Sequence, residues 1–104
     1  MLFRSELSLA RAEADAGVAR AARARDIALA RAERGRQLVA SANRVAAMSM
    51  TAFREGAAPI STVLEAQRTA RETLATYIDD LARAWIAIAT ERVLTLTTTP
   101  DRPQ

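Results

Sequence analysis

The chain has 104 residues, which is room for a single domain, and half of them are hydrophobic. The hydrophobic share is mainly alanine, because the chain holds only two Phe, one Tyr and one Trp, so the composition favours helix and offers little material for a compact core. With no Cys and no His, disulfides, thiolate metal sites and imidazole catalysis are excluded, and we expect no enzyme, no metal site and no cofactor.

The opening segment, MLFRSELSLARAEADA, does not read as a signal peptide, because Arg4 and Glu6 interrupt any apolar region. No apolar run reaches the ~18 residues of a membrane-spanning helix. From about residue 5 to residue 55 the sequence instead predicts one continuous helix, with Gly17 and Gly35 as tolerated interruptions costing roughly 1 kcal/mol each.

A helix of this length needs support along its sides. Its large apolar residues do not gather on one stripe but point in several directions, with alanine between them: Leu7, Leu9, Val18, Ile27, Leu29, Leu38, Val39 and Val45. We therefore expect this helix to have neighbours on more than one side.

The net charge is +3, and its basic excess is confined to the first half of the chain. Four arginines fall near one face of the first helix: Arg20, Arg23, Arg31 and Arg34. One interpretation is a polyanion-binding stripe. We favour a solvated face mixed with Asp15, Asp26 and Glu33, because the sequence has no helix-turn-helix spacing and no aromatic stacking platform. No nucleic-acid partner is expected.

A turn is predicted at residues 56–60. Gly56 suits the left-handed position that ends a helix, and Pro59 prevents simple continuation. The next helix can restart with Thr62 as its N-cap and Glu65 completing a capping box, with Ser61 as the alternative cap.

The second helix, about residues 61–97, has a heptad pattern as far as Asp80. Its core positions are Ile60, Val63, Leu64, Gln67, Ala70, Leu74, Tyr77, Ile78, Leu81, Ala84, Trp85 and Ile88. The run AWIAIA, residues 84–89, is apolar nearly all round and should be more fully enclosed. The chain as a whole, 1–104, thus predicts an all-α fold: one long antiparallel, coiled-coil-like helical hairpin with a disordered tail at 98–104.

The ordered set of residues around the turn resembles the last helical hairpin of TolC-like outer-membrane efflux proteins. The resemblance rests on Phe53-Arg54-Glu55-Gly56, then Ile60, then residues 63–68 (VLEAQR), then Tyr77. It is most specific over residues 53–78. Its extent corresponds to about the C-terminal quarter of such a protein, so the segments that cross the outer membrane would lie outside this chain.

The resemblance implies a periplasmic fragment of a trimeric α-barrel, which is a passive conduit for drugs or metal ions in a tripartite export system. A membrane-fusion adaptor protein would dock at the turn, and the tip residues would be Phe53, Gly56, Ala57, Ala58, Pro59 and Ser61. Thr62 and Glu65 would occupy the positions of the channel gate. Some relatives carry acids at both gate positions, whereas here an acidic ring would rest on Glu65. Phe53 lacks the hydroxyl of the usual tip Tyr, and Ala58 stands where a gate Arg can occur.

The main alternative is a free-standing coiled-coil hairpin that acts as a protein–protein interaction module. Other candidate sites are weaker. Asp79 and Asp80 diverge by ~100° on a helix and do not converge on one metal ion. Met48 and Met50, two positions apart, are expected to fill packing gaps. Tyr77 and Trp85 are expected to be packing residues.

Overall fold

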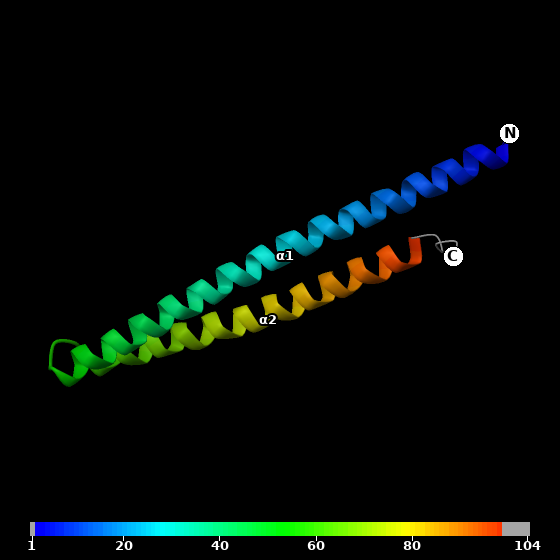
Figure 1. Cartoon of the computed structure of the whole chain (residues 1–104). Helices are drawn as coiled ribbons and strands as arrows, with labels where there is room; N and C mark the ends of the chain where they lie inside the picture. Colours follow the sequence, from blue (N-terminus) through cyan, green and yellow to red (C-terminus); the bar gives the residue numbers. More distant parts are fainter. Residues whose placement is uncertain (1, 99–104) are drawn as a thin grey trace, which may run out of the picture.

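The computed structural model of the chain describes residues 2–98. Helix α1 spans Leu2–Arg54 and helix α2 spans Ile60–Thr98, and the described residues contain no strand. The two helices run antiparallel as a hairpin (Figure 1), with overall extents of 82 × 29 × 13 Å. The predicted all-α helical hairpin is therefore confirmed.

The helix bounds differ slightly from the predicted ones. α1 begins at Leu2 rather than near residue 5, and α2 continues through Thr98, which the sequence assigned to the tail. The rest of that tail, residues 99–104, lies outside the described residues. The N-terminal part of α1 runs past the end of α2 (Figure 1), and side chains 3–13 are all exposed. Over the described part of the chain, neither helix is long and apolar enough to cross a membrane.

The contact between the helices is a seam of mostly small residues, spaced alternately three and four positions apart. On α1 the seam consists of Ala14, Val18, Ala21, Arg25, Ala28, Ala32, Gly35, Val39, Ala42, Ala46 and Ser49. On α2 it consists of Val63, Ala66, Ala70, Thr73, Tyr77, Asp80, Ala84, Ala87, Glu91, Leu94 and Thr98. All of these residues are buried or half-buried. This spacing is the heptad repeat of a coiled coil.

The seam buries little apolar surface. Its buried apolar side chains, within the described residues, are Ala21, Ala32, Val63 and Ala84. Since burial stabilises by roughly 25 cal/mol per Å² of apolar surface, three alanines and one valine contribute little. The seam determines how the two helices pack against each other, and the larger apolar side chains lie outside it.

Gly35 is buried in the seam, directly against α2. A Cβ atom at this position would lie 3.0 Å from Cδ1 of Tyr77 and 3.5 Å from Oδ2 of Asp80. α1 runs unbroken through Gly35, as predicted, and the missing side chain of Gly35 also leaves the space that Tyr77 fills. Gly17 differs, since a Cβ there would meet only Nη2 of Arg20 at 3.9 Å.

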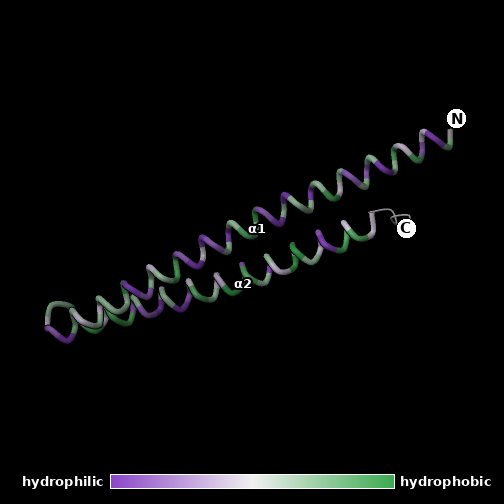
Figure 2. The backbone as a smooth tube through the Cα atoms, in the orientation of Figure 1, coloured by the Kyte–Doolittle hydropathy of each residue, from purple (hydrophilic) through white to green (hydrophobic). Residues whose placement is uncertain are grey.

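The large apolar side chains point away from the seam. On α2 they follow directly after seam residues and form an apolar stripe, defined as Leu64, Leu74, Ile78, Leu81, Trp85 and Ile88. Hydrophobic and hydrophilic segments accordingly alternate along both helices (Figure 2). The expectation that residues 84–89 are enclosed is wrong within this chain, because Trp85 is 71% exposed and Ile86 is 65% exposed.

One ion pair joins the two helices across the seam. Nη1 of Arg25 donates a hydrogen bond to Oε2 of Glu91 at 2.5 Å, and Nη2 of Arg25 donates to Oδ1 of Asp26 at 3.0 Å. The hydrogen bond to Asp26, together with the charge of Glu91, raises the pKa of Arg25 above its ordinary value. The ion pair with Glu91 links the two helices in the part of the hairpin remote from the turn.

Candidate functional site

The turn between the helices is held by its own backbone hydrogen bonds. The N–H of Gly56 donates to the carbonyl of Phe53 at 3.0 Å, and the N–H of Ala57 donates to the carbonyl of Ala52 at 2.8 Å. This pair of bonds is the Schellman motif that ends a helix. Gly56 has a φ of +77°, as the sequence predicted, and a Cβ there would meet nothing within 4 Å. Glycine is therefore required at position 56 because of the positive φ, and not because a side chain would collide with a neighbour.

The second helix starts earlier than the predicted capping box. The carbonyl of Pro59 accepts a hydrogen bond from the N–H of Thr62 at 3.1 Å, and α2 begins at Ile60. Ser61 and Thr62 therefore lie inside the first turn of the helix. The predictions that Thr62 or Ser61 is the N-cap are therefore wrong. The helix starts directly after Pro59, whose ring already fixes its own φ near the helical value.

The turn presents an apolar surface at the end of the hairpin. Of the predicted tip residues, Phe53, Gly56, Ala57, Pro59 and Ser61 are exposed, and Ala58 is half-buried. Phe53 is 39% exposed, and the adjacent Ile60 is 49% exposed. Ile60 was not among the predicted tip residues, although its position directly after Pro59 could have indicated it. Two large apolar side chains, Phe53 and Ile60, are thus exposed at the end of the hairpin.

The two predicted gate residues share one face of the hairpin. Thr62 and Glu65 line a shallow groove whose other wall is formed by α1 residues that include Val45 and Ser49. Both predicted gate side chains are exposed. The structure thus brings Thr62 and Glu65 together, and it separates them from the apolar stripe on the other side of α2.

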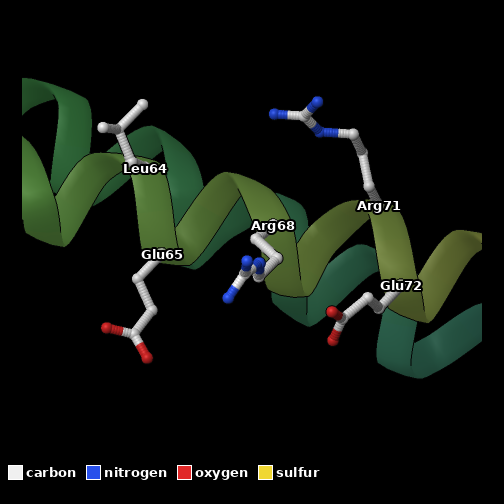
Figure 3. A pocket seen from close by; sticks show the side chains of 5 residues that line it. All are labelled: Leu64, Glu65, Arg68, Arg71 and Glu72. Carbon is white, nitrogen blue, oxygen red and sulfur yellow. The ribbon is translucent and has the colours of Figure 1, made fainter.

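The close-up of α2 near the turn shows this division of its surface (Figure 3). Leu64 and Arg71 point to one side of the helix, whereas Glu65 and Glu72 point to the opposite side, with Arg68 between the two acids. The side of α2 that faces away from α1 is its outer edge, and its charged residues are Glu65, Arg68, Glu72 and Asp79. This edge is available to a neighbour.

α1 has an outer edge and an apolar stripe of its own. Its large apolar residues come directly before seam residues and form a stripe, defined as Ile27, Leu38, Val45 and Met48. The arginines that point away from α2 are Arg23 and Arg44. Arg20, Arg31 and Arg34 come directly before seam residues, so these three of the four predicted surface arginines lie on the same face as the apolar stripe and interrupt it.

Metal chemistry finds no support among the described residues. They contain no group of three or more potential His, Cys, Asp or Glu ligands that could hold a metal ion. Asp79 is exposed on the outer edge of α2, while Asp80 is half-buried in the seam. The two carboxylates thus belong to different surfaces of the helix.

Comparison with known proteins identifies no relative. No protein-family model matches the chain, and neither the curated proteins nor the solved structures contain a match. The functional interpretation therefore depends on the surfaces described above.

Proposed function

We propose that the hairpin is a wall segment of a helical conduit, the periplasmic α-barrel of an outer-membrane efflux channel. In this role α1 and α2 pack against neighbouring helices on both sides, and the hairpin has no catalytic step. The observation that carries the proposal is the outward exposure of large apolar side chains on both helices, including Leu38, Ile78 and Trp85. Exposed apolar surface in excess of scattered single residues is typical of interaction sites.

The turn supports a second part of the proposal, the docking of a periplasmic membrane-fusion adaptor at the tip. Its backbone is fixed by two hydrogen bonds, so Phe53, Ala57 and Pro59 are held outward on a rigid frame. The resemblance of residues 53–78 to TolC-like channels favours an adaptor as the partner. Thr62 and Glu65, one turn further on, would face the lumen as gate residues.

The test is a chimeric channel in which this hairpin replaces the last helical hairpin of a TolC-like protein. A photo-reactive amino acid at Ala57 is expected to cross-link to the adaptor in cells, because Ala57 is exposed at the tip. The matched control places the same group at Ala82, which is exposed on α2 far from the turn.

A chimera that assembles as a trimer but gives no adaptor cross-link from Ala57 would contradict the proposal. Equal adaptor cross-linking from Ala57 and Ala82 would contradict it as well, since the contact would then not be located at the tip.

A further inference from the structure

The apolar stripe of α2 belongs to a second row of residues with the spacing of a coiled coil. This row, called here the second seam, takes the residue directly after each seam residue of α2, so its spacing also alternates between three and four. Its members are Leu64, Gln67, Arg71, Leu74, Ile78, Leu81, Trp85, Ile88, Arg92 and Thr95. Because successive helix residues are ~100° apart, the second seam faces about 100° away from α1. Such spacing is the pattern against which another helix packs.

The second seam has the shape of a site for one helix. Leu64, Leu74, Ile78 and Trp85 are exposed, and Leu81 and Ile88 are half-buried. The residues that flank it on the outer edge of α2 between Leu74 and Ile88 are small, namely Ala75, Ala82 and Ala89. Small side chains allow a neighbouring helix axis to approach closely. A stripe this narrow is typical of a coiled-coil contact, whereas a broad apolar face would be needed to lie on a lipid surface.

The charges on this surface all have one sign. Arg71 and Arg92 stand in the second seam, Arg68 lies beside it, and the described part of α2 has no acid in either row. Its acids lie on the opposite face or in the seam with α1: Glu65, Glu72, Asp79, Asp80 and Glu91. Arg71 and Glu72 accordingly point to opposite sides of the helix (Figure 3). Among the described residues, the side chains of the three arginines form no ion pair or hydrogen bond.

We propose that the second seam binds an amphipathic helix that carries acidic residues. Arg71 and Arg92 are three heptads apart, about 32 Å along α2, so the acids of the partner helix have the same separation. The apolar residues between those acids pack on the stripe, and the acids supply the missing counter-charges. The inference goes beyond the proposed function, since neither the conduit role nor adaptor docking requires this helix to be acidic.

A second copy of the chain does not offer such a helix. Within α1 and α2, no two acids are three heptads apart. On α1, the acids that share a face with Leu29 are Asp26 and Glu33, and both already accept hydrogen bonds from arginines of their own helix. Two second seams placed against each other would bring together arginines without acids, and like charges in an interface oppose association. The partner is therefore a helix of different sequence.

Trp85 provides a direct readout, because it is the only tryptophan of the chain and lies within the stripe. The probe is a synthetic peptide of about four heptads with Leu at its core positions, no Trp, and two Glu three heptads apart. The matched probe has Lys in place of both Glu. The Glu peptide is expected to shift the emission of Trp85 to shorter wavelength and to bind about tenfold more tightly than the Lys peptide.

A charge exchange on the chain provides an independent measurement. The double variant Arg71→Glu with Arg92→Glu should reverse the preference and bind the Lys peptide more tightly. The matched control is Arg44→Glu with Arg83→Glu, which changes the net charge equally. Arg44 points away from α2, and Arg83 lies on the other face of α2, so this variant should keep the wild-type preference. Circular dichroism of each variant checks that the helices persist.

The proposal is overturned if the wild-type chain binds both peptides equally, if neither shifts the emission of Trp85, or if the control variant also reverses the preference. A larger shift with vesicles of anionic phospholipid than with the Glu peptide assigns the stripe to a lipid surface and overturns it as well. So does a shift produced by raising the chain concentration that the Glu peptide cannot change further, because a second copy then covers the stripe.

The outcomes separate this inference from the proposed function. A chimera that cross-links to the adaptor through Ala57, with no preference for the Glu peptide, leaves the conduit role standing and removes the acidic helix. The reverse result keeps the acidic helix and removes the conduit role.

Discussion

The seam and the apolar stripes of the same two helices are built from opposite kinds of residue. The seam uses alanine or glycine at half of its positions, with Val63 as its largest fully buried side chain. The stripes hold larger residues such as Leu, Ile and Trp, most of which remain exposed, while Leu81 and Ile88 are half-buried. Small domains ordinarily bury such residues first. The seam therefore positions the two helices while burying little apolar surface, and the difference supports the proposal that neighbouring helices cover the stripes.

The largest loss of stability is expected when a larger side chain is placed in the seam at Gly35. Gly35→Val puts branched carbon atoms where Tyr77 already lies 3.0 Å from a Cβ position. Overpacking of this kind typically costs about 1–3 kcal/mol. Urea denaturation should show that the free energy of unfolding of the variant is lower than that of the wild type by this amount.

The matched control is Gly17→Val, where a Cβ meets only the end of Arg20 at 3.9 Å. This variant should unfold at the same urea concentration as the wild type or slightly above it. Equal losses at the two glycines would remove the argument that the seam depends on small residues.

A somewhat smaller effect is expected at the turn. Gly56→Val forces a branched residue into a φ of +77°, which costs about 1–2 kcal/mol without any steric contact. Gly56→Asn should lose less, because Asn adopts this conformation more readily. Thermal melts of both variants test the ranking, and an unchanged melt for Gly56→Val would show that the turn rearranges freely.

A smaller effect still is expected for the ion pair across the seam. Glu91→Gln removes the carboxylate that holds Arg25, so the melting temperature should fall by less than in either glycine variant. The difference from the wild type should shrink at high salt, because both side chains remain partly exposed. A loss that persists at about 1 M salt would indicate a packing role for Glu91.

The smallest effect concerns a pair within α1, outside the seam. Arg36 donates hydrogen bonds to Glu33, and these lower the pKa of Glu33 below its ordinary value. A lowered folded-state pKa gives stability that is present above the unfolded pKa and lost as pH falls through the folded one. NMR titration should show the pKa of Glu33 rising in Arg36→Gln, and an unchanged pKa would contradict this pairing.

The hairpin itself could be predicted from the sequence because its signals are local. Gly56 and Pro59 interrupt a long helix-forming pattern, and a left-handed glycine followed by proline allows few other interpretations. The seam could be predicted on α2, where the heptad pattern places Val63, Ala70 and Tyr77 at core positions, but not on α1, where the large apolar residues do not follow it. The signal was the alternating three- and four-residue spacing of small residues such as Ala28, Ala32 and Gly35.

The candidate site was less predictable, because exposure depends on tertiary packing. The pattern grouped Leu64, Ile78 and Trp85 with the seam residues Val63 and Tyr77 as a single core. These two sets lie ~100° apart on the helix, and only the second contacts α1. A heptad pattern in one helix cannot reveal how many neighbours share its apolar positions.

The central claim is that the chain reserves its large apolar residues for neighbouring helices. Its most direct test is thermal unfolding, followed by circular dichroism in the far ultraviolet, over a wide range of chain concentrations. Because association stabilises the folded form by mass action, the melting temperature should rise steadily with concentration. A sharp melt at the same temperature across that range would show that the isolated hairpin is stable without neighbours and would contradict the account.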